Sequence, residues 1–227
     1  MKKVLPVIAF VCLANLLFAQ TEKIPSIKYG VEAGLNESLL QSNIGGTTSS
    51  SLLTGYKIGV FAEFHNQHNI TIQPALYFTT KGGHYDVSQS FTSNGVTFND
   101  NGTENINLKY IELPINILFH IDAGTGKIFL GGGPYIGWGI SGTDNLTNNQ
   151  SYNGASTSSS QSNSIVFGNT AGDYKNPDYG LNATGGFTLK KGWMFRLNWG
   201  FGKGNLNTNG SDVSNEVASL SVGYVFK

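Results

Sequence analysis

The stretch 108–140 constrains the fold of this chain more than any other part of the sequence. Within 111–121 every second residue is apolar, and residues of the opposite parity include Glu112. Within 128–140 one parity is apolar and the other is rich in glycine. A period of two is typical of a β-strand whose two faces meet different environments. Because 122–126 holds two glycines, it predicts a turn, and the stretch becomes a long β-hairpin.

The same alternation recurs along the whole chain and predicts eight strands. They are expected at 27–35, 56–65, 70–81, 108–121, 128–140, 179–189, 193–202 and 218–226. Each segment supplies about ten residues, the length that a tilted strand needs to cross a bilayer. Their apolar faces carry no charge, although 12% of the chain is charged. A face without charges is expected in contact with lipid, where an Arg or Lys near the midplane costs about 2–4 kcal/mol. It is equally expected of a face that packs in a protein core.

The opposite faces decide between lipid and a protein core. They carry charges of both signs among glycines and small polar residues, at Lys28, Glu32, Lys57, Glu63, Glu112 and Arg196. A soluble barrel would bury the apolar face and expose the polar one. Glycines and isolated charges are instead typical of the filled interior of a small membrane barrel. We therefore expect these six residues to form a polar network in the lumen. Two interpretations stay open: a paired plug, or a narrow ion path past Glu32, Glu63, Glu112 and Arg196.

Large aromatic residues gather at both ends of the apolar faces, with aliphatic residues between them. The residues that we expect at the membrane interfaces include Phe64, Phe119, Trp138, Trp193, Trp199, Tyr224 and Phe226. Two aromatic girdles around an aliphatic band are typical of transmembrane barrels.

Connection lengths support the same fold. Short connections at 65–69, 122–126 and 190–192 alternate with long polar ones at about 36–53, 82–107, 141–178 and 204–216. Short periplasmic turns and long extracellular loops are expected of an outer-membrane barrel. The sequence thus predicts an all-β fold, an eight-stranded antiparallel up-and-down transmembrane β-barrel. Pro74, Pro114 and Pro134 fall inside strands, and we expect them at bulges or ladder breaks on the lipid face.

The N-terminus predicts export. Lys2 and Lys3 precede an apolar run that closes at Ala19, as in a signal peptide cleaved after residue 19. Residues 20–227 would then form a single outer-membrane barrel domain. Cys12 is the only cysteine and would leave with the signal; its use as a lipid-acylation site is a weaker alternative.

Several short motifs carry a family resemblance. They include Tyr29-Gly30-Val31, Gln73-Pro74, Tyr110-Ile111-Glu112-Leu113-Pro114, Gly133-Pro134-Tyr135 and Gly223-Tyr224-Val225-Phe226. In their order and spacing the chain resembles the PorT-like family of outer-membrane β-barrels. The resemblance implies an integral protein of the Gram-negative outer membrane, some of whose relatives are linked to protein secretion. It also implies recognition of the C-terminal strand by the barrel-assembly machinery, although Lys227 follows the terminal aromatic residue. It supplies no catalytic residue.

Function is expected to reside in the long loops, because a rigid scaffold presents them outward. Tyr152, Phe167 and Tyr174 are candidate anchors for an extracellular or secretion-related protein partner; the alternative is that they are disordered or packed on the barrel rim. The formal net charge of +0 offers no basic field for nucleic acid. We expect outer-membrane lipid around the barrel, no cofactor, no metal and no catalytic residue.

The alternatives are a narrow channel and a lipid-modifying enzyme. His65, His68, His84 and His120 are too dispersed in the sequence to predict a metal site. The serines within 156–164 have no nearby histidine, so a nucleophile with its base is not supported.

Overall fold

The computed structural model of the protein describes residues 26–42, 49–66, 69–93, 96–152, 155–168, 170–208 and 213–226. The expected signal peptide and His68 lie outside these residues. Ten strands are described: β1 (Ser26–Ser42), β2 (Ser49–Ser51), β3 (Leu53–His65), β4 (Ile70–Ser93), β5 (Val96–Ala123), β6 (Gly126–Tyr152), β7 (Ala155–Ile165), β8 (Asp178–Leu189), β9 (Trp193–Gly202) and β10 (Val213–Val225). In the described part of the chain no helix has the length and apolar character that crossing a membrane requires.

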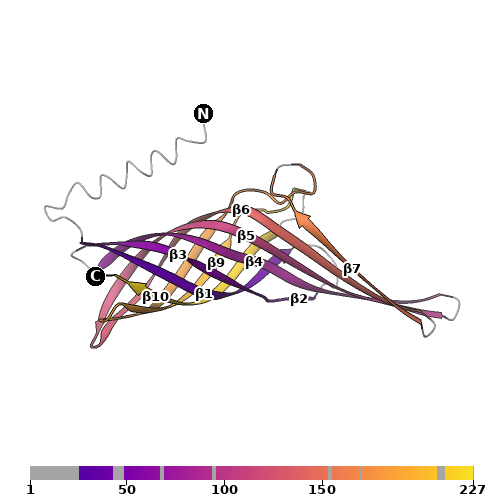
Figure 1. Cartoon of the computed structure of the whole chain (residues 1–227), viewed down its shortest axis with the longest axis horizontal. Helices are drawn as coiled ribbons and strands as arrows, with labels where there is room; N and C mark the ends of the chain where they lie inside the picture. Colours follow the sequence, from indigo (N-terminus) through magenta and orange to yellow (C-terminus); the bar gives the residue numbers. More distant parts are fainter. Residues whose placement is uncertain are drawn as a thin grey trace.

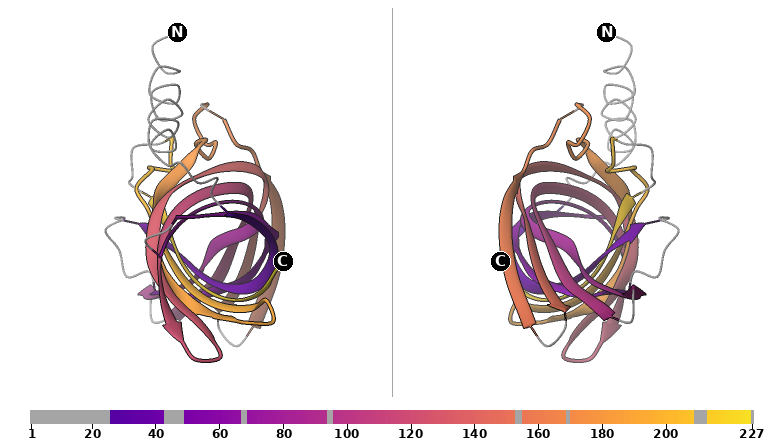
Figure 2. Two further views of the ribbon diagram at one scale, coloured as in Figure 1. Left: turned by 90° about the vertical axis from the view of Figure 1, so that its left-hand side faces the viewer. Right: turned by 90° about the vertical axis from the view of Figure 1, so that its right-hand side faces the viewer.

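Eight of these strands close into a ring, and Figure 2 shows the ring from its two ends. Their order is β1, β3, β4, β5, β6, β8, β9 and β10, each antiparallel to its neighbours, and β1 pairs with β10 to close the ring. The predicted eight-stranded barrel is confirmed. A continuous ring leaves no sheet edge along its wall, which is the only way that strands satisfy their backbone groups in lipid.

The pairing register shows how steeply the strands are staggered. From Ile27 of β1, successive cross-strand partners lead once around the ring and return to β1 at Glu37. They are Phe64, Ile72, Ile117, Gly132, Ala183, Trp199 and Ala218. One circuit therefore advances ten residues along β1, from Ile27 to Glu37. Stagger and strand number together set the width of a barrel, and eight strands enclose a space that side chains fill.

The prolines interrupt the ladder without shifting it. On either side of Pro74 and Pro114 the paired residues keep the same register. The expected bulges are therefore not present at these two prolines, whereas the expected breaks in the hydrogen-bond ladder are. The shift that does occur lies between Lys109 and Tyr110, where β6 carries one extra residue, Ile140. Pro74 and Pro134 are on the outward face as expected. Pro114 is buried and faces the lumen, because it shares the parity of Glu112.

Two hairpins continue far beyond the barrel, and Figure 1 shows them tapering away on the right. The expected loop at 82–107 is mostly strand, since β4 and β5 pair as far as Ser93 and Val96. Within the expected loop at 141–178, β6 and β7 pair over their full common length. We call the residues 82–93, 96–107, 142–152 and 155–165 the extended sheet. Its strand order is β4, β5, β6, β7, and β2 adds a short strand beside the base of β4.

The inside of the barrel contains two buried apolar clusters. The lower cluster lies toward the short turns and consists of Phe61, Ala75, Tyr77, Leu118, Phe129, Met194 and Val225. The upper cluster lies toward the extended sheet and consists of Leu40, Ile106, Leu108, Tyr110 and Leu206. The outward face is the reverse of a soluble protein's surface: Leu35, Ile58 and Leu197 are about 60% exposed, at 63%, 57% and 64%.

Candidate functional site

Glu32 of β1 is the centre of the first charged group in the lumen. Its Oε1 lies 2.8 Å from Nζ of Lys57, and its Oε2 lies 3.5 Å from Nε of Arg196. The Tyr77 hydroxyl donates a hydrogen bond of 2.9 Å to Oε2. All four residues are buried. One carboxylate thus faces two cations from different strands, which compensates the cost of removing the charges from water.

Arg196 extends this group toward the short turns. Its Nη2 donates to Oε1 of Gln73 at 2.6 Å, and Gln73 Nε2 donates to Oε1 of Glu63 at 3.0 Å. The guanidinium also lies over two aromatic rings of the lower cluster, 5.8 Å from the centroid of Phe61 and 5.3 Å from that of Phe129. Cation–π contacts of this kind strengthen in a desolvated interior.

Lys81 is the centre of a second charged group. Its ammonium lies 3.1 Å from Oδ2 of Asp178 and is also paired with Glu112. It sits over the rings of Tyr135, at 4.4 Å, and Tyr110, at 5.3 Å. Asn215 donates a hydrogen bond of 3.0 Å to the same oxygen of Asp178. The lumen therefore carries two compensated groups rather than one.

The structure brings together five of the six predicted lumen charges in these two groups. Lys28 is the exception, because it is exposed near the short turns and forms no ion pair within the described residues. The prediction missed Lys81 and Asp178, since both fall at the borders of segments expected to be loops. The inward parity of Lys81, shared with Tyr77 and Gln73, was the available signal for it.

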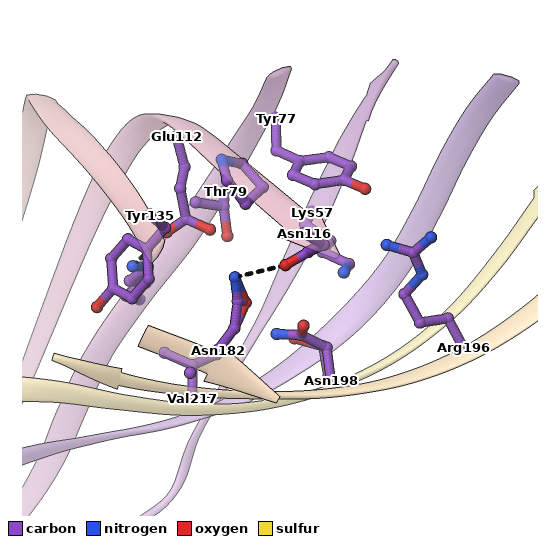
Figure 3. A pocket seen from close by; sticks show the side chains of 14 residues that line it. Lys57, Tyr77, Thr79, Glu112, Asn116, Tyr135, Asn182, Arg196, Asn198 and Val217 are labelled. Atoms are coloured by element: carbon purple, nitrogen blue, oxygen red, sulfur yellow. Dashed lines mark hydrogen bonds and ion pairs between the residues drawn. The ribbon is translucent and has the colours of Figure 1, made fainter. Parts of the chain in front are cut away.

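Little space remains between the two groups. The cavity that they line has a volume of about 30 Å³, and Figure 3 shows Asn182 donating across it to Asn116 at 3.1 Å. That volume corresponds to roughly one water molecule. Beyond it, the upper cluster packs against Phe167 and Tyr174, whose rings lie 6.3 Å apart. Side chains thus fill both the middle of the lumen and its end toward the extended sheet.

Lumen glycines make room for the rings. A Cβ added to Gly30 would lie 2.2 Å from the ring of Phe61, and one added to Gly59 would meet the ring of Tyr77 at 2.6 Å. The glycine-rich parity of the sequence is therefore a packing requirement of the buried aromatic side chains.

The predicted interface aromatics lie on the outward face at the two ends of the barrel. Near the short turns, Tyr224 contacts Trp193 at a ring-centroid distance of 5.4 Å and Phe226 at 5.5 Å. Phe64 and Phe119 belong to the same end, since both pair with strand residues adjoining the short turns. At the other end Trp138 is half exposed, and Trp199 donates a hydrogen bond of 2.9 Å to Glu216.

The extended sheet is largely polar, and side-chain hydrogen bonds connect its neighbouring strands. Ser88 donates to Asn101 at 2.7 Å, and Ser162 donates to Asn145 at 2.7 Å. Cross-strand polar pairs of this kind replace apolar burial as the source of sheet stability. The sequence did carry a signal for both hairpins: the dipeptides at 94–95 and 153–154 are Asn-Gly, which favours two-residue hairpin turns.

The histidines do not remain dispersed in space. The rings of His65 and His120 lie 5.7 Å apart near the short turns. His84 is in β4 rather than a loop, with Nδ1 2.6 Å from Asn105 and Nε2 3.3 Å from Asp86. The described residues contain no group of three or more His, Cys, Asp or Glu side chains arranged to hold a metal ion.

A closed ring of eight strands, an apolar outer surface edged by aromatics and a charge-compensated interior define an integral membrane β-barrel. The chain belongs to the family described as outer membrane protein beta-barrel domain, which matches residues 18–201. The protein is accordingly integral to the outer membrane of a Gram-negative bacterium. From the usual topology of such barrels we expect the short turns to face the periplasm and the extended sheet to lie outside the cell.

Among solved structures, the chain is similar to the attachment invasion locus protein Ail of Yersinia pestis. The identity is 15%, the match covers 88% of this chain and 98% of that one, and the TM-score is 0.41. It is also similar to Neisserial surface protein A, at 12% identity, with 88% and 99% covered and a TM-score of 0.35. A comparison with curated proteins finds no match.

Proposed function

We propose that this protein is a non-enzymatic surface protein, in which the barrel is an anchor and the extended sheet binds an extracellular or secretion-related protein partner. The observation that carries this proposal is the length of the two hairpins beyond the barrel. The β4–β5 hairpin pairs without a break from Gly82 with Asn107 to Ser93 with Val96, and only its base contributes to the upper cluster. The barrel wall closes without a sheet of this size, and such a sheet would present recognition groups on a rigid support.

The binding edge of the sheet is β7. It pairs only with β6, so one side of its backbone has no strand beside it among the described residues. All but the last of its residues are exposed. Natural edge strands are protected by charge, proline or bulges, whereas 155–165 contains no charged residue and no proline. An extended segment of a partner could add to such an edge by main-chain hydrogen bonds.

The opposite edge is less suitable. At the base of β4, Ser49–Ser51 of β2 pair with residues 84–86 and occupy that part of the edge. The strand-addition proposal therefore concerns β7 and not β4.

Two observations favour this role over the alternatives. A channel needs a continuous path, and the lumen is filled by two ion-paired groups and two apolar clusters. An acyl-transferring enzyme needs a serine with a free base, and both ring nitrogens of His84 already have partners. Single-channel recordings that reveal conductance steps would support the channel instead.

The same proposal includes three features that rest on the sequence: membership of the PorT-like group, cleavage of residues 1–19, and recognition of β10 by the barrel-assembly machinery. Phe226 next to β10 is half exposed and belongs to the periplasmic aromatic girdle, as an assembly signal requires access. Outer-membrane lipid covers the outward face.

The test is a pair of lysine variants at adjacent strands. Ser156→Lys with Ser158→Lys places charges on the edge strand, and Ser151→Lys with Asn149→Lys places the same charges opposite them on β6. Cross-linking in native outer membranes, followed by affinity capture of the intact protein, should yield a partner with the wild type and the β6 variant. The β7 variant should lose it. Equal capture with all three would show that strand addition at β7 is not the binding mode.

A further inference from the structure

The periplasmic mouth of the barrel contains a second cavity, separate from the filled lumen. Its volume is about 170 Å³, and it is lined by residues of β1, β3, β5, β6, β8 and β10 and of the turn between β8 and β9. Its charged and imidazole groups are Lys28, Glu63, His65, His120, Asp122, Lys127 and Lys190. We call these seven residues the periplasmic pocket. The volume equals roughly that of five water molecules, so a small ion fits.

Two imidazoles in the periplasmic pocket have ring nitrogens without a partner among the described residues. His120 is buried, 6% exposed, and among the described residues neither of its ring nitrogens has a hydrogen-bond partner. Among the described residues, Nδ1 of His65 is likewise buried without a partner. The rings of His65 and His120 lie 5.7 Å apart. An imidazole always carries at least one N–H donor. His65 can direct its N–H toward Glu63, which lies 3.5 Å from Nε2, whereas the N–H of His120 has no acceptor on either nitrogen within the described residues. Buried donors in native proteins are nearly always satisfied, so His120 indicates a missing acceptor.

The charges of the pocket determine which acceptor suits it. Lys127 is 3.5 Å from Asp122, and Glu63 is engaged by Gln73 and His65. Within the described residues Lys28 and Lys190 have no carboxylate within ion-pairing distance. The pocket thus holds three lysines against the two carboxylates Glu63 and Asp122, and the unpaired ammonium groups of Lys28 and Lys190 lie beside the unsatisfied imidazole of His120. A cation would be repelled by the lysines, and an oxyanion would satisfy both kinds of group.

We propose that the periplasmic pocket binds a phosphate group, with Lys28 and Lys190 supplying charge and His120 donating a hydrogen bond beside His65. The phosphate belongs either to a free phosphate ion in the periplasm or to a phospholipid headgroup of the inner leaflet, which lies at this depth. Both present the same tetrahedral oxyanion to the pocket. This site is independent of the extended sheet and of its partner.

The test uses the full-length barrel in maltoside micelles, which contain no phosphate. Inorganic phosphate is titrated while the imidazole C–H signals are followed by NMR. The signals of His65 and His120 should shift and saturate. The signal of His84 should not, because its ring nitrogens are already bonded to groups at the other end of the barrel.

Lysines that line the pocket are compared with Lys191, which neighbours Lys190 in the same turn but does not line the pocket. Lys28→Ala with Lys190→Ala should weaken phosphate binding about tenfold, because two charge-assisted contacts are lost. Lys191→Ala removes the neighbouring charge, which does not line the pocket, and should leave the affinity unchanged. Heat-modifiable migration on gels verifies that each variant folds.

A second titration distinguishes the two sources of phosphate. Short-chain phosphatidic acid should bind more tightly than inorganic phosphate if the natural ligand is a headgroup, and less tightly if it is the free ion. A non-saturating shift of all histidine signals in parallel would overturn the proposal. Equal affinity of the double-lysine variant and the wild type would overturn it too.

Discussion

Lys81 of β4 and Asp178 of β8 meet across the lumen, with Nζ 3.1 Å from Oδ2, although 97 residues separate them in the chain. Two strands, β5 and β6, lie between them on the shorter path around the wall. The contact therefore connects opposite sides of the barrel through its interior. Such a pair ties the wall together in a way that no neighbouring-strand hydrogen bond does.

Removing one partner of this pair should weaken the barrel strongly. Lys81→Met leaves the buried carboxylate of Asp178 and the partly buried one of Glu112 without a cation, and the loss of a partner from a buried pair costs about 3–5 kcal/mol. Urea unfolding in lipid vesicles, followed by tryptophan fluorescence, measures it. Lys191→Met, at an exposed turn, is the control and should change little. A Lys81→Met barrel as stable as the wild type would refute the structural role of the pair.

Gly30 should not tolerate a side chain. Its added Cβ would lie 2.2 Å from the Phe61 ring, which itself packs under Arg196. Gly30→Ala should therefore destabilise the barrel by about 1–3 kcal/mol through overpacking. Gly200 also faces the lumen, yet the nearest atom to its added Cβ is 3.8 Å away. Gly200→Ala should be neutral in the same unfolding assay, and equal losses in both variants would contradict the packing explanation.

The three tryptophans should lie at the two membrane interfaces and not at the centre. Single-tryptophan variants that keep Trp138, Trp193 or Trp199 can be placed in vesicles of lipids brominated at different depths. All three should be quenched most by bromines close to the headgroups, since indoles prefer this zone. Strongest quenching by bromines at the acyl-chain ends would contradict the girdle assignment.

The extended sheet should become more stable as the pH falls. Glu104 of β5 and Asp144 of β6 are diagonal neighbours on one face, because Asp144 is opposite Ile106. Burial, followed by the charge of Asp144, raises the pKa of Glu104 above its ordinary value of 4.5, and burial raises the pKa of Asp144 above 3.8. A raised carboxyl pKa means that folding disfavours the charged form. The penalty is absent below the ordinary values and grows as the pH rises through the raised ones.

Hydrogen exchange of residues 96–107 and 142–152, corrected for the intrinsic effect of pH, measures this trend. Protection should be higher at pH 4 than at pH 7. Glu104→Gln should raise protection at pH 7 and flatten the dependence on pH, whereas Glu37→Gln, at a carboxylate on β1 outside the extended sheet, should leave it unchanged. A Glu104→Gln sheet with the wild-type pH dependence would contradict the assignment.

The parity of the sequence was sufficient to predict the eight-stranded ring and the faces of residues such as Glu32 and Arg196. A period of two assigns a side chain to a face, but it carries no information about depth along the barrel axis or about the partner across the lumen. For this reason Lys28, which has the correct parity, was expected in the network and lies at the mouth. Partners such as Lys81 and Asp178 depend on the stagger of ten residues, which only the closed structure supplies.

The extended sheet escaped prediction for another reason. Beyond its base, where Ile106 packs into the upper cluster, its strands are connected by side-chain hydrogen bonds such as Ser88 with Asn101. A regular apolar alternation is therefore missing from most of 82–107. The periplasmic pair of His65 and His120 was likewise invisible, because their positions in the chain are far apart and only the β3–β4–β5 register brings them together.

The pairing of Gly30 with Val225 has a consequence for how the barrel is made. Until β10 has arrived, β1 and β9 each present an open edge whose backbone groups would have to enter lipid unsatisfied, at several kcal/mol per group. A partly inserted wall is therefore not a stable resting state. Insertion and closure must be one concerted event, or the open edges must be held by another protein until the first and last strands meet.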